Sequence, residues 1–292
     1  MDHIYRAGPA HIHRIRLLLR TGRHQFRDFG SEDLASLLSD GVVILGEARD
    51  DPWGAAIVQR EGRSTALPAE APGRAMLRGV ALAAGRSPSN DIPLLIDAAA
   101  SELAAAAPLQ LVVYATRSWI VRPLLAAGFQ LDDRLLFYEL GGLQQRSPAQ
   151  PPDLPGIAVR PARPAEIERL TALDAATFTP MWHIGGQELM ALMLAGRVQL
   201  AERAGDPIGY TALTFQQDGV AHLARLAVHP AAQGLGVGRL LLHDAVMAAR
   251  ESMAATLLLN TQGKNERAQS LYRAFGFRAT GKVVPVLTLL IP

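Results

Sequence analysis

The chain has 292 residues, and its 49% apolar and 19% charged residues can bury hydrophobic cores, which excludes a mainly disordered protein. The net charge is only +2, and the lysines, Lys264 and Lys282, form no basic cluster, so no nucleic-acid partner is indicated. The absence of cysteine excludes disulfides and thiolate metal sites, and without a signal peptide or an unbroken apolar run of about 18 residues we expect a cytoplasmic protein that does not bind membranes.

A stretch rich in Pro, Gln and Gly divides the chain nearly in half. Residues 141–156 read GGLQQRSPAQPPDLPG and show no apolar period, as is typical of an extended linker. The chain is long enough for two domains of ordinary size. We therefore predict a first domain over residues 1–141, a linker over 142–156 and a second domain over 157–292.

The two halves show the same order of elements, which indicates an internal repeat. The corresponding segments are 94–99 and 241–246, with the pattern of an amphipathic helix, 111–114 and 257–260, which are short apolar strands, and 125–129 and 273–277, which end in Gly-Phe. The segments are displaced by about 147 residues, and two copies of one α/β unit explain their order. Coincidence among helices rich in Ala and Leu is the alternative.

In the second half, the predicted elements lead to one glycine-rich segment. These elements are a strand over 157–160, helices over 164–178 and 185–195, a hairpin of 198–204 with 209–215 around a turn at 204–207, and a strand over 221–228. The segment Gln233-Gly234-Leu235-Gly236-Val237-Gly238 then leads into a helix that begins near Arg239. Glycines at a helix N-terminus let backbone N–H groups approach an anion closely, and the helix dipole favours negative charge there. A plain turn before a helix is the alternative interpretation of the glycines alone.

This segment and one further motif resemble the two cofactor motifs of the GNAT superfamily of N-acetyltransferases. Gln233, Gly236 and Gly238 match Q/R-x-x-G-x-G/A, the acetyl-coenzyme A (acetyl-CoA) signature of that family. The motif N-x-x-A-x-x-L-Y-x-x-x-G-F is matched by Asn265, Ala268, Leu271, Tyr272, Gly276 and Phe277. Because two independent motifs stand at the right separation, the resemblance is specific, and it covers nearly all of residues 157–280.

The resemblance implies an α/β (α+β) fold of two GNAT-like domains, each with a mixed, mostly antiparallel central sheet flanked by helices. The sheet of such a domain splays between its fourth and fifth strands and holds the pantetheine arm of acetyl-CoA, which is a co-substrate; no metal is implied. The residues that the resemblance places at acetyl-CoA are Leu226, Ala227, Val228, Gln233, Gly234, Leu235, Gly236, Val237, Gly238, Arg239, Asn260, Asn265, Ala268 and Tyr272.

The implied reaction is direct attack of a neutral amine on the thioester, which needs a base, an oxyanion donor and an acid for the leaving thiolate. The resemblance assigns the acid to Tyr272 and the oxyanion donor to the backbone N–H of Val228. The base is open, because the strand 221–228 has no carboxylate. His222 and Glu202 are the candidates, and a histidine that only packs in the core or at the surface is the alternative for His222.

The first half lacks the residues that carry both motifs. Ser89 and Asp91 stand where the second half has the signature glycines, and Leu124 stands opposite Tyr272. The carboxylate of Asp91 would repel a pyrophosphate, and Pro88 removes a backbone amide. We therefore predict that residues 1–141 form a degenerate, non-catalytic GNAT-like domain.

The leading hypothesis is acetyl transfer from acetyl-CoA to a primary amine of a small molecule, a peptide or a protein N-terminus. An acyl-CoA sensor without catalysis is the alternative, and Tyr272 favours the enzyme because a sensor needs no acid. A Rossmann-type nucleotide site is disfavoured, because the glycine segment lacks the G-x-G-x-x-G spacing. The loop 178–183 is expected on the acceptor side, and the acceptor, the acyl-chain length and a homo-oligomeric state stay open.

Overall fold

The computed structural model describes residues 2–30, 32–106, 108–145 and 150–292, which belong to two compact units. Unit 1 comprises residues 1–63, 70–134 and 284–292, and unit 2 comprises residues 64–69 and 135–283. The linker predicted over 142–156 falls within unit 2, and its residues 146–149 lie outside the described residues.

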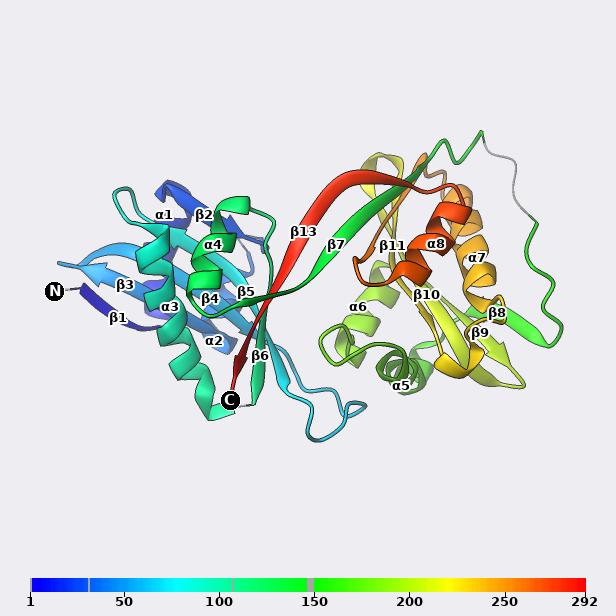
Figure 1. Ribbon diagram of the computed structural model, residues 1–292, viewed down its shortest axis with the longest axis horizontal. Coiled ribbons are helices and arrows are strands. Elements are labelled where there is room, and N and C mark those ends of the chain that lie inside the picture. Colours follow the sequence, from blue (N-terminus) through cyan, green and yellow to red (C-terminus); the bar gives the residue numbers. More distant parts are fainter. Residues whose placement is uncertain (1, 31, 107, 146–149) are drawn as a thin grey trace. The chain divides into compact units, whose positions relative to one another are not determined.

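Unit 1 is a mostly antiparallel sheet with helices on both faces (Figure 1). Its elements are β1 (Asp2–Ala7), a 3-10 turn (Pro9–His11), α1 (Ile12–Thr21), β2 (His24–Arg27), α2 (Leu34–Asp40), β3 (Val42–Ala48), β4 (Asp51–Arg60), β5 (Gly73–Leu82), α3 (Pro88–Leu103), a 3-10 turn (Ala104–Ala106), β6 (Leu109–Tyr114) and α4 (Ser118–Ala126). The strands follow the order β1-β3-β4-β5-β6 and then the end of β13 (Arg278–Ile291), with β5 and β6 parallel. Helices α3 and α4 pack in the core on one face, and α1 and α2 pack in the core on the other.

Unit 2 repeats this architecture. Its elements are β7 (Gln130–Gly141) from residue 135, β8 (Ile157–Pro161), a 3-10 turn (Pro164–Glu166), α5 (Ile167–Thr177), α6 (Gly186–Ala195), β9 (Gly196–Arg203), β10 (Asp206–Gln216), a 3-10 turn (Gln217–Gly219), β11 (Val220–Val228), a 3-10 turn (Pro230–Ala232), α7 (Val237–Glu251), β12 (Thr256–Gln262), α8 (Glu266–Ala274) and the start of β13. The strands follow the order β7-β12-β11-β10-β9-β8, with β11 and β12 parallel and the other pairs antiparallel. Helices α7 and α8 pack on one face, and α5 and α6 pack on the other. The predicted fold class is confirmed.

The last strand of each half of the chain crosses from one unit to the other. β7 enters unit 2 at Leu135 and pairs there with β12, and β13 enters unit 1 at Val284 and pairs there with β6. The compact units therefore differ from the domains expected at 1–141 and 157–292. The reason is that a strand pattern shows which residues face a core, whereas the sheet that the strand joins depends on contacts distant in the sequence.

The hairpin of β9 and β10 shows how local chemistry sets the elements of unit 2. Ala204 and Gly205 both have positive φ, at 53° and 87°, and Arg203 pairs with Asp206 across them. A two-residue turn of this kind matches the twist of the flanking strands. The turn is therefore shorter than predicted, because Asp206 and Pro207 already belong to β10. None of the helices within the described ranges is long and apolar enough to cross a membrane.

Candidate active site

The sheet of unit 2 opens between β11 and β12. The two parallel strands are paired only over Val220–Leu223 and Thr256–Leu259. Beyond these residues β11 stays paired with β10 as far as Val228, and β12 stays paired with β7 as far as Gln262. The facing edges of β11 and β12 therefore separate after Leu223, which is the splay that the resemblance implied. We call this opening the β11–β12 gap.

The edge of β11 presents backbone groups to the gap. The N–H of His229 donates to the carbonyl of Ile208 at 2.9 Å, on the β10 side. Backbone groups of successive residues in an antiparallel pair point to alternate sides, so those of Leu226 and Val228 point toward the gap. The Val228 carbonyl accepts a hydrogen bond from Gln233 Nε2 at 3.1 Å. The N–H groups of Leu226 and Val228 thus face the gap as donors, whereas Ala227 faces β10.

The glycine-rich turn follows β11 and starts α7. Gly234 and Gly236 both have φ of +88°, a left-handed conformation that favours glycine. Gly236 is the N-cap of α7, so the first amides of the helix, from Val237 onward, have no intrahelical acceptor and form a site that favours an anion. Arg267 on α8 adds positive charge beside the turn, where its Nη1 donates to Gln233 Oε1 at 2.7 Å. The other residues predicted for this site are Leu235, Gly238 and Arg239, in the same turn and the first turn of α7.

Helix α8 carries the second motif. The ring of Tyr272 is buried, with its centroid 6.3 Å from that of Tyr138 and 5.9 Å from that of Phe277. Burial raises the pKa of the Tyr272 hydroxyl to about 12, so it keeps its proton at neutral pH, as an acid must. Asn265 caps the helix, because its Oδ1 accepts from the N–H of Ala268 at 3.0 Å. This cap explains the asparagine of the motif, and a contact of Asn265 with acetyl-CoA stays a prediction.

His222 lies at the closed end of the gap, on the face of the sheet opposite α7 and α8. It shares this face with Leu258 and Asn260, whereas Leu223 and Leu259 lie in the core under α7 and α8. Its Nε2 lies 3.3 Å from Asn260 Oδ1. An amide oxygen only accepts hydrogen bonds, so Nε2–H of the neutral ring donates and Nδ1 keeps its lone pair. Burial lowers the pKa of His222, and the bond to Asn260 offsets this only in part, so the ring is neutral at pH 7 and able to accept a proton.

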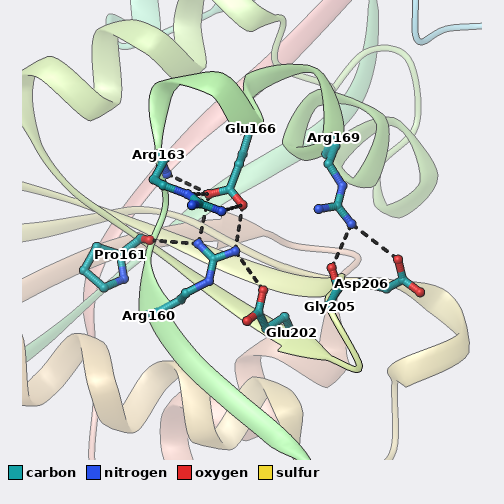
Figure 2. A network of polar contacts seen from close by, with 8 residues as sticks. All are labelled: Arg160, Pro161, Arg163, Glu166, Arg169, Glu202, Gly205 and Asp206. Atoms are coloured by element: carbon teal, nitrogen blue, oxygen red, sulfur yellow. Dashed lines mark hydrogen bonds and ion pairs between the residues drawn. The ribbon is translucent and has the colours of Figure 1, made fainter.

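Glu202, the other predicted base, belongs to an ion-pair network at β8 and β9 (Figure 2). Arg160 donates to Glu202 Oε2 at 2.7 Å and to the two carboxylate oxygens of Glu166 at 2.7 and 2.9 Å. The N–H of Arg163 donates to Glu166 Oε2 at 2.8 Å. The hydrogen bond from Arg160 lowers the pKa of Glu202, and β10 separates β9 from β11. A carboxylate held by a guanidinium two strands from the gap is poorly placed to act as the base, so the geometry favours His222 over Glu202, whose role stays a prediction.

A buried network that the sequence analysis missed connects α5, β10 and β11. The fully buried Asp174 accepts hydrogen bonds from Arg225 Nε and Nη2 at 2.8 and 2.7 Å, Tyr210 Oη at 2.5 Å, His183 Nδ1 at 3.0 Å and the N–H of Ile184 at 2.9 Å. Burial acts to raise the pKa of Asp174, but the hydrogen bonds from His183 and Arg225 outweigh it, so this pKa lies below its ordinary value. Asp174 therefore stays ionised inside the unit.

The same network anchors the loop 178–183, which was expected on the acceptor side. Arg225 Nη2 donates to the carbonyl of Trp182 at 2.7 Å, and the guanidinium carbon lies 3.6 Å from the ring centroid of Phe178. Arg225 thus ties the loop to β11 as an ion-pairing and packing residue. The sequence contained one indication of this network. Asp174 follows Leu173 on the apolar side of a predicted helix, where a buried carboxylate needs hydrogen-bond or ion-pair partners.

Unit 1 has the same opening between its parallel strands, but its own chain fills it. β5 and β6 pair only over Gly73–Met76 and Leu109–Val112. Beyond them, β2 pairs with Gly79–Leu82 of β5, on the edge that β4 leaves free. β2 therefore occupies the position that is open beside Leu226 and Val228 in unit 2.

The start of α3 in unit 1 also differs from the glycine-rich turn. The buried Asp91 accepts hydrogen bonds from the N–H of Ser87 and from Arg86 Nη2, both at 2.7 Å. Pro88, the first residue of α3, has no N–H to donate. A carboxylate of the chain itself thus stands at the helix N-terminus where unit 2 has free amides.

Comparison with known proteins shows which proteins the chain is similar to. Residues 167–277 match the model of the Acetyltransferase (GNAT) family. A crystal structure of a GCN5-related N-acetyltransferase from Sphaerobacter thermophilus covers 99% of this chain and 96% of its own, with a TM-score of 0.63 and 14% identity. A tandem GNAT protein from the clavulanic acid biosynthesis pathway covers 100% and 99%, with a TM-score of 0.62 and 14% identity. At such identities these structures show that the whole chain has a tandem GNAT fold.

Two curated relatives match shorter segments. A putative [ribosomal protein bS18]-alanine N-acetyltransferase of Bacillus subtilis (strain 168) is 29% identical over 126 residues, which is 42% of this chain and 82% of the relative. The peptidyl-lysine N-acetyltransferase YjaB of Escherichia coli (strain K12) is 36% identical over 76 residues, which is 26% of this chain and 45% of the relative. The chain is therefore similar to N-acetyltransferases of the GNAT superfamily, and the match to the family model lies within unit 2.

Proposed function

We propose that unit 2 transfers an acetyl group from acetyl-CoA to a primary amine by direct attack in a ternary complex. The observation that carries this proposal is the β11–β12 gap, with the glycine-rich turn at its open end and Tyr272 and His222 at its closed end, on opposite faces of the sheet. An arm that enters at the turn and pairs with Leu226 and Val228 runs toward Leu223. Its thioester then lies beside the two titratable side chains.

The turn and α8 supply the groups for the remainder of acetyl-CoA. The amides from Gly234 to Arg239 suit the pyrophosphate, and Arg267 lies close enough to the turn to add charge. The side-chain amide of Asn260 at the closed end suits the acyl end of the arm. The remaining residues that we propose to line the site are Ala227, Gln233, Asn265 and Ala268.

The chemistry follows from these positions. His222 Nδ1 takes a proton from the ammonium group of the acceptor, and the neutral nitrogen attacks the thioester carbon. The C–S bond breaks as the tetrahedral intermediate collapses, and the thiolate takes the proton of the Tyr272 hydroxyl. The nitrogen loses its second proton as the amide forms, and this proton restores the Tyr272 hydroxyl. Each transfer thus makes one amide and one thiol and releases one proton.

The position of the closed end of the gap decides which backbone N–H is proposed as the oxyanion donor. The sequence analysis assigned this role to the N–H of Val228. The N–H of Leu226 faces the same gap and lies two residues nearer the closed end, where the thioester is expected. We therefore propose Leu226 as the oxyanion donor and Val228 as the partner of the pantetheine arm.

We infer that unit 1 binds no acetyl-CoA and is not catalytic. β2 fills the position of the arm, and Asp91 fills the position of the pyrophosphate. What the first half of the chain supplies to unit 2 is the part of β7 from Leu135, which completes the sheet of unit 2 beside β12.

The acceptor is proposed from the chemistry of the relatives. Their names place the acetyl group on the alanine of a ribosomal protein and on a peptidyl lysine. A peptide N-terminus, a lysine side chain and small primary amines are accordingly the acceptors to screen. A cytoplasmic location stays a prediction from composition.

Thermal unfolding with and without acetyl-CoA tests the site. Ligand at a hundred times its dissociation constant should stabilise unit 2 by about 2.7 kcal/mol, and each kcal/mol raises the midpoint by roughly 2–4 °C in a domain of this size. Gly236→Glu places bulk and negative charge at the start of α7 and should abolish the shift. Gly205→Glu is the matched control, because Gly205 has φ of +87° and open space around it, in a turn away from the gap.

The outcomes separate the hypotheses. A shift in the wild type and in Gly205→Glu that is lost in Gly236→Glu supports the proposed site. A folded wild type without a shift refutes acetyl-CoA binding. A thermal shift with acetyl-CoA but without turnover of any amine would favour the acyl-CoA sensor.

A further inference from the structure

The exchanged strand β7 brings a carboxylate onto the face of the sheet that carries His222. Glu139 of β7 pairs with Leu258 of β12, and Leu258 pairs with His222 of β11. Phe137 pairs in the same way with Asn260, the hydrogen-bond partner of His222. Residues directly opposite each other in a ladder share one face. Glu139 and Phe137 therefore extend the surface at the closed end of the gap.

The packing of the neighbouring residues agrees with this assignment. Tyr138 and Leu140, on either side of Glu139, lie in the core under α7 and α8 together with Leu257 and Leu259. Glu139 is exposed. On this face α5 packs against β10 and β11, and α6 packs against β9 and β10.

The charges on this surface are few. Within the described residues the carboxylate of Glu139 has neither a hydrogen bond nor an ion pair with another residue. The neighbouring cation is Lys282, whose Nζ lies 4.5 Å from the ring centroid of Phe137. His222 is the titratable group on the β11 side, and Arg225 is held by Asp174.

We propose that Glu139 binds the ammonium group of the acceptor, so the acceptor class of this site is a cationic amine. The inference rests on the proposed acetyl transfer. Strands lie about 4.8 Å apart, so the backbones of Glu139 and His222 are on the order of 10 Å apart with Leu258 between them. Both side chains extend from the same face, and a nitrogen held between their ends contacts the carboxylate and Nδ1 of the ring.

Glu139 acts here as a binding residue and moves no proton. Its carboxylate attracts the cationic form of the amine to the place where His222 removes the proton. β11 has no carboxylate of its own. The acidic group of the site thus comes from the first half of the chain, by way of the strand exchange.

Steady-state kinetics of three variants tests the inference with two probe amines, 1,5-diaminopentane and an N-terminally acetylated peptide with one lysine. Glu139→Gln should raise KM for both about fivefold, the upper range for a partly exposed ion pair. The effect should shrink as salt is raised from 0.05 to 0.5 M, because salt screens exposed charges. Lys282→Met removes the opposing charge and should lower KM. Glu168→Gln, which removes an exposed carboxylate on α5, should leave KM unchanged.

The result that overturns the inference is a Glu139→Gln variant that matches Glu168→Gln at every salt concentration. Folding of each variant is checked by the thermal shift with acetyl-CoA, which does not depend on the acceptor. If the wild type shows this shift but acetylates neither probe amine, the proposal of a cationic acceptor is refuted, whereas acetyl-CoA binding is retained. A wild type without the shift refutes the proposed function itself.

Discussion

Asp174 and Arg225 form a two-point ion pair, with Oδ1 2.7 Å from Nη2 and Oδ2 2.8 Å from Nε. Asp174 is completely buried, and the side chain of Arg225 is 11% exposed. The pair joins α5 to β11, the strand that borders the gap. It therefore connects the stability of unit 2 with the geometry of the candidate site.

Asp174→Asn should destabilise unit 2 by about 3–5 kcal/mol, because it leaves the Arg225 guanidinium buried without its counter-charge. Because the folded pKa of Asp174 is lowered, the stabilisation is present above the unfolded value of about 4 and is lost as pH falls below it. Urea unfolding at pH 7 and pH 3.5 measures both effects. Asp206→Asn, in the exposed ion pair with Arg169, is the control and should cost less than about 1 kcal/mol. Equal losses in the two variants would contradict the structural role.

His222→Gln should lower kcat/KM by about 10²–10⁴-fold, the range for loss of a general base. In the wild type the base is active only when neutral, and its pKa is lowered by burial, so activity should fall with an acid limb below the ordinary value of about 6.5. A pH–rate profile checks this. His13→Gln, an exposed histidine of unit 1, should keep the profile of the wild type. An unchanged acid limb in His222→Gln would exclude His222 as the base.

Tyr272→Phe should lower kcat by about 10²–10⁴-fold and keep the thermal shift with acetyl-CoA, because only the proton donor is removed. The pKa of about 12 also predicts that ionisation of Tyr272 causes no fall in activity below pH 10. Tyr138→Phe, in the ring that lies beside Tyr272, is the control and should retain kcat. If Tyr272→Phe turned over at the wild-type rate, Tyr272 would not be the general acid and its ring would only pack in the core.

Isothermal titration should give one acetyl-CoA per chain. Asp91→Ala opens the start of α3, yet β2 still fills the edge of β5, so the variant should also bind one. Its binding enthalpy and dissociation constant should equal those of the wild type, because unit 2 is unchanged. A second binding event in either protein would contradict the inference that unit 1 is closed to the ligand.

The sequence by itself determined the features that depend on local chemistry. Gly234 and Gly236 suit a left-handed turn at a helix start, and Asn265 suits a helix cap. Both motifs could be recognised in the sequence because their residue types and spacing resemble those of a known family. The hairpin, the two helices before it and the apolar strands followed from periodicity and turn residues. The repeat of these elements predicted the second copy of the fold.

Only the tertiary structure decided which distant residues meet. The sequence has no sign that β7 and β13 change units, because a strand pairs through backbone groups that every residue carries. The position of Glu139 beside His222 and the filling of unit 1 by β2 depend on that pairing. The ion pair of Glu202 could not be predicted for the same reason, since its partner Arg160 is 42 residues away in the chain and lies on the adjacent strand. The sequence shows which side chains can act as acids, bases or anion-binding groups. Strand pairing in the folded sheet decides which charged residues lie next to each of them.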